Sequence, residues 1–257
     1  GTGGTGGAGG GGTGGAGGGG TGGTGGGTGG SGALSYAQVV LADAPVAYWR
    51  LGETSGLVAH DSSGNGYDLA CLGGFTLGVA GLQTSDGDTA IELDGVDGLL
   101  QGPDALDFAT ATEFTAEGWV KLDRLPDTGS QFGMVIKRDT IASLDEGWAL
   151  RIEDNGEAEI RLWLNDVSTR ADAVTAITVG VRVHVAGVFD NGTLRLYLNG
   201  AQEDVVTGVS NPLDTAGVLT LGFDPDSGYL DGVLDEVALY DQALTQVQLL
   251  NHIAAAD

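Results

Sequence analysis

The sequence predicts an all-β fold, a two-sheet antiparallel jelly-roll sandwich with short flanking helices, preceded by an extended glycine-rich segment. From residue 88 onward, apolar and polar residues alternate with a period of two, which is typical of strands with one buried face. Asn-Gly pairs at 155–156, 191–192 and 199–200 separate these runs and favour tight hairpins. The residues that follow the glycine-rich segment suit one large β domain.

The domain from residue 33 to residue 257 begins with a short helix. Ser35 and Gln38 have the spacing of a capping box, and Pro45 ends the helix. The next stretch, VAYWRL, is strand-like, and the residues after it are dense in turn formers. We therefore expect one helix, one strand and a long turn region before the regular strands begin.

The regular strands have two distinct sides. In FTAEGWVKL (114–122) the side with Phe114, Ala116, Gly118, Val120 and Leu122 is the apolar one. In the arm after Asn155-Gly156, apolar residues occupy the even positions 158–164 and polar or aromatic residues the odd ones. Between the two later Asn-Gly turns, Leu194, Leu196 and Leu198 are predicted to face the core. This pattern predicts two layers that bury their aliphatic sides against each other.

The last predicted strand, GVLDEVALYD (232–241), raises a question about Asp235. Strict alternation places Val233, Asp235, Val237 and Leu239 on one side, which looks like a core face. A buried carboxylate without a partner is costly, so Asp235 is expected to hold something.

The C-terminal residues predict a second helix. Thr245 and Gln248 form a capping box, and Val247, Leu250 and Ile253 are expected to supply its apolar stripe.

The composition limits the partners. With 35 acidic and 10 basic residues the formal net charge is −25, which argues against nucleic acid and anionic membranes and suits divalent cations. The single cysteine, Cys71, excludes an internal disulfide and is interpreted as a buried, inert thiol. The sequence has no apolar run long enough to span a membrane.

Residues 1–32 form a glycine-rich spacer. Nine of these 32 residues are Thr, Ala or Ser, so the segment holds 23 of the 49 glycines. One interpretation is a flexible linker. The other is a polyglycine-II-like rod, because interruptions spaced mostly by three residues line one edge of a helix with three residues per turn. At roughly 3.1 Å per residue the rod would reach about 100 Å.

Six motifs occur in order along residues 33–257. They are YWRLGE (48–53), DSSGNGYDL (61–69), AIELDGVDGLL (90–100), FTAEGWVKL (114–122), VHVAGVFDNGTLRLYLNG (183–200) and LDEVALYDQALT (234–245). This series resembles the laminin-G-like, concanavalin A-like jelly rolls, which implies a binding or adhesion module, often with a structural calcium ion. The glycine-rich segment followed by SYAQVVLADAPVAYWRLGE resembles the C-terminal part of minor tail or fibre proteins of tailed bacteriophages, which implies a position at the tip of a fibre.

A structural Ca²⁺ site is one interpretation of the acidic loop near residue 61. Calcium takes six to eight oxygen ligands, and the loop AHDSSGNG offers several. In the resembling folds a calcium ion joins an N-terminal loop to an acid on the last strand, which implies Asp61 and Asp235 as ligands, with Glu53 as a third. The alternatives are that Asp61 caps its own turn and that Asp235 accepts backbone N–H groups or pairs with an arginine.

A ligand-binding face is a second interpretation. Aromatic and charged side chains recur on the outward sides of three strands, namely Trp119, Arg161, Trp163, Arg195 and Tyr197, with Glu159 and His184 beside them. Aromatic rings stack on sugars, and Arg and Glu orient hydroxyl groups, so a glycan site is conceivable. The alternatives are a solvated sheet face or contact with a neighbouring subunit.

The sequence favours a protein that is not an enzyme. The nearest pair of carboxyls at strand spacing is Glu157 and Glu159, beside a turn where exposed acids are expected anyway. The strand motif E-x-D-x-x-E is absent, and His60, His184 and His252 do not have the spacing of zinc ligands.

Three functional hypotheses follow. The favoured one is a structural and adhesive module at the end of a viral tail fibre or a cell-surface appendage. Such a module would form a homo-oligomer, with trimers favoured, and would contact a surface glycan or protein. The second is a carbohydrate-binding module tethered by a flexible linker to an enzyme, and the third is a polysaccharide-cleaving enzyme. The expected location is the virion, or the cell exterior and surface.

Overall fold

The computed structural model describes residues 1, 3–4, 7, 34–85, 87–139 and 145–257. The chain divides into two units, Gly1–Gly32 and Ala33–Asp257. The predictions of a flexible linker or a polyglycine-II-like rod concern residues that lie almost entirely outside the described ones.

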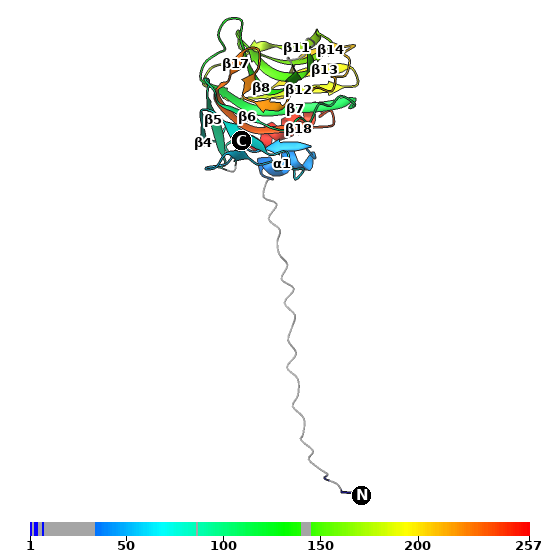
Figure 1. Ribbon diagram of the computed structural model, residues 1–257. Helices are drawn as coiled ribbons and strands as arrows, with labels where there is room; N and C mark the ends of the chain where they lie inside the picture. Colours follow the sequence, from blue (N-terminus) through cyan, green and yellow to red (C-terminus); the bar gives the residue numbers. More distant parts are fainter. Residues whose placement is uncertain (2, 5–6, 8–33, 86, 140–144) are drawn as a thin grey trace. The chain divides into compact units, whose positions relative to one another are not determined.

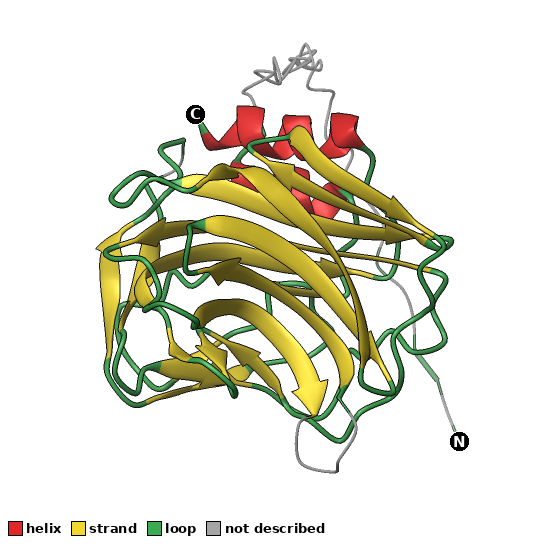
Figure 2. Ribbon diagram, turned by 90° about the horizontal axis from the view of Figure 1, so that it is seen from above, coloured by secondary structure: helices red, strands yellow, loops and turns green. Residues whose placement is uncertain are grey.

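Two antiparallel eight-stranded sheets face each other in the described part of the second unit (Figures 1 and 2). Sheet A has the order β14 (Ala201–Thr207), β13 (Thr193–Leu198), β12 (Val183–Asp190), β7 (Glu113–Leu122), β18 (Asp231–Tyr240), β5 (Thr89–Asp94) and β4 (Phe75–Ala80), and β1 (Ala47–Trp49) pairs with β18. Sheet B has the order β11 (Val167–Ala176), β10 (Glu157–Leu164), β9 (Glu146–Glu153), β8 (Gln131–Asp139), β15 (Leu219–Leu221), β6 (Leu99–Gln101), β3 (Leu69–Leu72) and β2 (Val58–Ala59). A small ribbon consists of β16 (Phe223–Asp224) and β17 (Gly228–Tyr229). The predicted all-β sandwich is therefore confirmed.

The predicted hairpins are confirmed at the Asn-Gly turns. Asn191 and Gly192 join β12 to β13 with φ of 46° and 81°, and Asn199 and Gly200 join β13 to β14 with φ of 46° and 75°. Two successive left-handed residues define the tight turn that matches strand twist, which is why Asn-Gly is favoured there. The turn at residues 154–156 joins β9 to β10, as expected.

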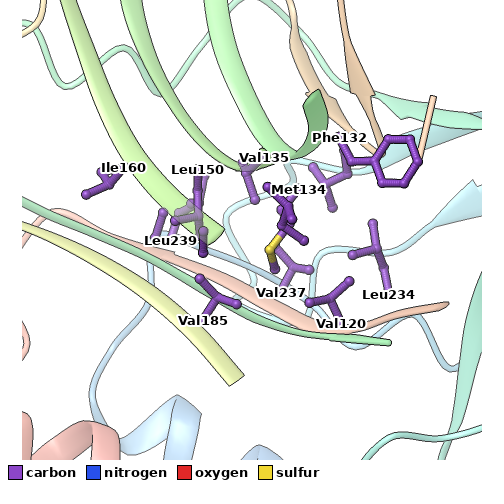
Figure 3. Packing of buried hydrophobic residues seen from close by; sticks show 14 of the residues in the cluster. Val120, Phe132, Met134, Val135, Leu150, Ile160, Val185, Leu234, Val237 and Leu239 are labelled. Carbon is purple, nitrogen blue, oxygen red and sulfur yellow. The ribbon is translucent and has the colours of Figure 1, made fainter. Parts of the chain in front are cut away.

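The core lies between the two sheets. Figure 3 shows side chains of sheet B, including Met134 and Leu150, meeting side chains of sheet A, including Val120 and Val237. The predicted inner face of β13 is buried, with Leu194, Leu196 and Leu198 at most 5% exposed. Alternation along these strands therefore predicted the core correctly.

The last strand departs from strict alternation. Leu234 and Val237 both belong to the core between the sheets, although they are three residues apart. A bulge between Asp235 and Ala238 causes this, and Glu236 there has the left-handed φ of 52°. Asp235 therefore lies on the outer side of sheet A. The expectation that it faces the sandwich core is wrong, because the extra residue reverses the alternation.

Two helices cover the outer face of sheet A (Figure 2). They are α1 (Tyr36–Ala42) and α2 (Gln246–Ala256), and both predicted capping boxes are present. The predicted apolar stripe of α2 is wrong at Val247 and Leu250, which are 66% and 46% exposed. Ile253, the third predicted residue, is partly buried and packs against the cluster beneath the helices. The buried side consists of Leu249, His252 and Ala256. In the described residues no helix has the length and apolarity required to cross a membrane.

Candidate functional site

The outer face of sheet B carries a cluster of charged side chains around Trp163. On β10 this face holds Glu159, Arg161 and Trp163, because Ile160 and Leu162 between them belong to the core. The helices lie on the other sheet, so they do not cover this cluster. We call Trp163 and the three arginines around it, Arg138, Arg151 and Arg161, the Trp163 cluster.

The Trp163 ring is packed among guanidinium groups. The Cζ atom of Arg138 lies 4.2 Å from the ring centroid, and those of Arg151 and Arg161 lie at 5.3 and 5.5 Å. Only 4% of Trp163 is exposed. These contacts are favourable cation–π interactions, so the ring supports the arginines rather than presenting a free face. Direct ligand contact at Trp163 and Arg161 stays a prediction.

Glu159 is the centre of the ion pairs on this face. Its Oε1 atom accepts a hydrogen bond from Arg151 and lies 2.8 Å from Arg161 Nε, while Arg170 Nη1 lies 3.4 Å from Oε2. Burial alone would raise the pKa of Glu159, but Arg151 and Arg161 hold it below its ordinary value. Burial, and then the charge of Glu159, raise the pKa of Glu153 to about 7.

An open pocket of about 150 Å³ adjoins the Trp163 cluster. Its lining residues come from β8, β15, β16 and the intervening loops, and they are Ile136, Arg138, Asp139, Gly217, Val218, Thr220, Phe223 and Pro225. Ile136 also packs with Trp163, so the pocket continues into the cluster. We call it the sheet B pocket. Half-buried Phe223 gives it an aromatic wall, and the sequence reasoning missed this residue because its strand has only two residues.

The other predicted ligand-binding residues lie on sheet A. Trp119 is buried beneath the helices and donates a hydrogen bond from Nε1 to the Tyr36 hydroxyl at 3.0 Å. Tyr197 belongs to the same buried cluster, and Arg195 pairs with Asp190 at 3.0 Å. The five predicted residues therefore do not share one face, because alternation shows the side of a strand but not the sheet that it joins.

The predicted calcium ligands near the N-terminal side are engaged with the backbone. Asp61 accepts hydrogen bonds from the N–H groups of Tyr48, Ser63 and Tyr67 at 2.9–3.0 Å. Burial alone would raise the pKa of Asp61, but these bonds and the Ser63 hydroxyl lower it. Glu53 Oε1 accepts from the His60 N–H at 2.9 Å. Asp61 therefore organises its own turn, which was the alternative interpretation.

Asp235 and Glu236 form a buried acidic pair. Asp235 Oδ2 accepts from the Leu82 N–H at 2.7 Å, while within the described residues its Oδ1 has no hydrogen-bond partner. Glu236 accepts from the Tyr48 hydroxyl and lies 3.7 Å from Arg50 Nε. Burial raises the pKa of Asp235 to about 7. Burial, and then the charge of Asp235, raise that of Glu236 to about 9.

Among the described residues, no three or more His, Cys, Asp or Glu side chains gather where they could hold a metal ion. Calcium binding through Asp61, Asp235 and Glu53 stays a prediction, and it is measured by thermal unfolding. It predicts a higher Tm in calcium than in chelator, with the difference lost in Asp235→Asn. Equal Tm values in calcium and chelator would contradict it.

A second buried cluster joins the helices to sheet A. Both ring nitrogens of His252 on α2 face carboxylates, with Nδ1 2.8 Å from Glu117 Oε1 and Nε2 3.0 Å from Asp43 Oδ2. The Tyr240 hydroxyl donates to Glu117 Oε1 at 2.6 Å, and His184 Nε2 lies 3.2 Å from Oε2. Because a carboxylate only accepts, His252 must carry both protons and a positive charge.

In this second cluster, neighbouring groups shift the pKa values of Glu117 and His252 so that the charged forms are favoured. Burial alone would raise the pKa of Glu117, but His252 and His184 hold it well below its ordinary value. Burial opposes the charge on His252, yet Glu117 and Asp43 raise its pKa. The sequence alone showed His252 only as one of three histidines without the spacing of zinc ligands.

The two packed antiparallel sheets define a jelly-roll β-sandwich. Residues 94–249, more than half of the chain, match the Laminin_G_3 model, described as the concanavalin A-like lectin/glucanases superfamily. The chain belongs to this superfamily, which confirms the resemblance to laminin-G-like and concanavalin A-like domains. An alignment of 152 residues, which covers 54% of this chain, is 26% identical to Pappalysin-1 of Mus musculus and spans only 9% of that protein.

Solved structures with the same fold include binding domains. The binding domain of Paraclostridial Mosquitocidal Protein 1 has a TM-score of 0.66 at 18% identity, over 83% of this chain and 52% of that one. Domain 4 of AbnA, a GH43 extracellular arabinanase from Geobacillus stearothermophilus in complex with arabinotriose, scores 0.58 at 19% identity, over 83% and 98%. The binding domain of botulinum neurotoxin DC in complex with SialylT scores 0.61 at 11% identity, over 84% and 52%. These likenesses show a shared fold.

Proposed function

We propose that this chain is a non-catalytic adhesion module that binds a surface ligand, a glycan or a protein, in the sheet B pocket. The observation that carries the proposal is the half-buried ring of Phe223, which walls an open pocket on the sheet face that the helices leave uncovered. Ligand sites combine an apolar wall with a few polar groups, and Thr220 supplies a hydroxyl here.

Ion pairing on this face supports a binding role over catalysis. A retaining glycosidase needs two carboxyls roughly 5–5.5 Å apart that are free to act as nucleophile and acid. Glu159 is fully buried among arginines, and Glu157 Oε2 accepts a hydrogen bond from Asn155 Nδ2 beside the turn. Neither carboxyl is poised for attack on a sugar.

The similar structures support a ligand at the cell exterior. They include the binding domains of Paraclostridial Mosquitocidal Protein 1 and of botulinum neurotoxin DC. The botulinum neurotoxin DC domain occurs in complex with SialylT and in complex with rat synaptotagmin II, so the same fold accommodates ligands of more than one kind. We therefore propose an extracellular or surface-exposed location, with the end of a viral tail fibre or of a cell-surface appendage as the favoured setting.

A carbohydrate-binding module tethered to an enzyme is the second candidate. The likeness to domain 4 of the arabinanase favours it, because this chain matches 98% of that domain. The two settings make different predictions for the glycine-rich segment, since a fibre requires several chains side by side and a tether does not.

We expect the fibre setting to produce a defined oligomer, a trimer being favoured. Multi-angle light scattering of residues 1–257 and of residues 33–257 measures this. In the fibre, the longer chain is oligomeric, because neighbouring glycine-rich segments hydrogen-bond to one another. A monomer for both lengths would contradict the fibre and support the tether.

We expect Val218→Arg to abolish ligand binding, because Val218 lines the pocket and its side chain is exposed, so a long charged side chain fills the pocket without disturbing the core. Phe223→Ala should weaken binding at least ~10-fold through the lost aromatic wall. Binding to cells and to a glycan array is the measurement.

The matched control is Val58→Arg, a substitution of equal size at a residue of nearly equal exposure, 38% against 36%. Val58 lies on β2 at the far edge of the same sheet, three strands from β15. Equal losses in both variants, or full binding by Val218→Arg, would contradict the pocket as the ligand site.

A further inference from the structure

We infer that the sheet B pocket selects an uncharged saccharide and rejects saccharides that carry a carboxylate or a sulfate. The inference rests on the proposed function and adds the class of ligand. It depends on two observations: the basic side chains are paired with acidic ones, and the side chains around the pocket are acidic.

The one basic side chain in the pocket lining is already neutralised. Arg138 Nη2 donates to Asp145 at 2.7 Å, and Nη1 donates to Asp226. The guanidinium plane lies against Trp163, and only 5% of the side chain is exposed. An anionic ligand would have to displace one of these carboxylates to pair with the Nη1 or Nη2 atom of Arg138. The remaining donor, Nε–H, is buried.

The surroundings of the pocket are acidic. Asp139 lines the pocket itself, and Asp145 and Asp226 hold Arg138 from either side. Lys137, the residue before Arg138 on β8, is fully buried and pairs with Asp104 and Asp107 at 2.7 Å. A negatively charged ligand therefore meets three carboxylates close to Arg138 and no unpaired cation in the lining.

Basic side chains are paired with carboxylates throughout the described part of the domain. Nine of the 10 basic residues form at least one ion pair with an aspartate or a glutamate, and these are Arg50, Arg124, Lys137, Arg138, Arg151, Arg161, Arg170, Arg182 and Arg195. The chain carries a net charge of −25. The long-range field therefore repels anions as well, while it acts little on neutral sugars.

The lining that remains suits the apolar face of a sugar ring. Ile136, Val218, Phe223 and Pro225 provide apolar surface. Thr220 provides a hydroxyl that donates to the Phe223 carbonyl at 3.2 Å and keeps its acceptor capacity. An aromatic wall stacks on the C–H face of a pyranose or furanose ring. The negative net charge would also attract a basic peptide, but the apolar lining offers no favourable contacts to its cationic groups.

The test uses pairs of oligosaccharides that differ only in an acidic group. Residues 1–257 are titrated with lactosaminyl oligosaccharides with and without terminal sialic acid, and with arabino-oligosaccharides with and without a uronic acid. We expect the neutral member of a pair to bind at least 10-fold more tightly at low salt. The gap should narrow at about 1 M salt, because salt screens repulsion between exposed charges.

Two variants attribute the selectivity to the pocket. Asp139→Asn should narrow the difference in affinity between the neutral and the acidic member of a pair, because it removes a carboxylate from the pocket lining. The control is Asp127→Asn, which removes an exposed carboxylate outside the pocket lining and should leave the gap unchanged.

The outcomes distinguish failure of the proposed selectivity from failure of the sheet B pocket as the binding site. Equal or tighter binding of the acidic members, blocked by Val218→Arg, overturns the selectivity and leaves the binding site intact. Saccharide binding that Val218→Arg does not affect overturns both the selectivity and the pocket as the site. Silence toward every saccharide, with capture of a basic peptide, overturns the saccharide inference but leaves a protein ligand.

Discussion

Glu117→Gln is expected to destabilise the domain by about 3–5 kcal/mol, because it removes one partner from a buried set of charges. Glu117 holds the imidazolium of His252 on α2 and faces His184 on β12. The amide keeps the shape of the side chain but not its charge. His252 would then lie buried with Asp43 as its remaining carboxylate partner. Urea unfolding at pH 6 measures the free energy of unfolding.

The pH dependence distinguishes this mechanism from a general packing defect. The pKa of Glu117 is lowered, so its contribution is complete above its ordinary value of 4.5 and is lost as the pH falls. The pKa of His252 is raised, so its contribution is complete below its ordinary value of 6.5 and is lost as the pH rises through the folded-state pKa. The difference between wild type and Glu117→Gln should therefore be largest between about pH 4.5 and 6.5.

The matched control is Glu92→Gln on β5 of the same sheet, where the side chain is partly exposed. A surface substitution of this kind usually changes the free energy of unfolding by less than about 0.5 kcal/mol. A loss below about 1 kcal/mol in Glu117→Gln, or a loss that does not vary with pH, would contradict a charged clamp between α2 and sheet A.

The sequence predicted the layers of the fold better than the position of individual polar groups. Alternation and Asn-Gly turns are local signals, so they identified β12, β13 and their inner leucines correctly. A single extra residue at Glu236 was enough to place Asp235 on the opposite side from the one expected. A bulge depends on how neighbouring strands pair, and the strand's own residues do not show it.

The helices and the ligand residues show the same limit. The buried side of α2 contains His252. Histidine is a polar residue, so the sequence provides no reason to place it on the buried side of the helix. Its burial makes sense only beside Glu117 and Asp43, which lie more than 100 residues away in the chain. Likewise, Trp119 and Trp163 looked equivalent as outward aromatic residues, but the helices cover one and arginines surround the other.

Asp235→Asn is expected to stabilise the domain at alkaline pH by about 2–4 kcal/mol and to have little effect near pH 4. The pKa of Asp235 is raised to about 7, so the folded state keeps a proton that the unfolded state loses above its ordinary value of 3.8. Stability is then lost as the pH rises from about 4 through 7. Asparagine cannot ionise, and its side-chain oxygen still accepts from the Leu82 N–H.

Glu236 makes the pair more sensitive to pH than a lone acid. Its pKa of about 9 means that the two neighbours lose their protons in turn, with a second loss of stability toward pH 9. Asp235→Asn removes the first of these losses and lowers the pKa of Glu236, because the neighbouring charge is gone. The slope of the free energy of unfolding between pH 5 and 9 should therefore become shallower in the variant.

The measurement is urea unfolding at pH 4, 6 and 8.5 in chelator, with Asp241→Asn as the control. Asp241 directly follows β18 and is exposed, so its amide variant should follow the wild-type curve. A variant less stable than wild type at pH 8.5 in chelator would mean that the ionised Asp235 is held by a partner in the protein. A wild type that overtakes Asp235→Asn only when calcium is added would instead locate a cation at its Oδ1, the atom that has no hydrogen-bond partner among the described residues.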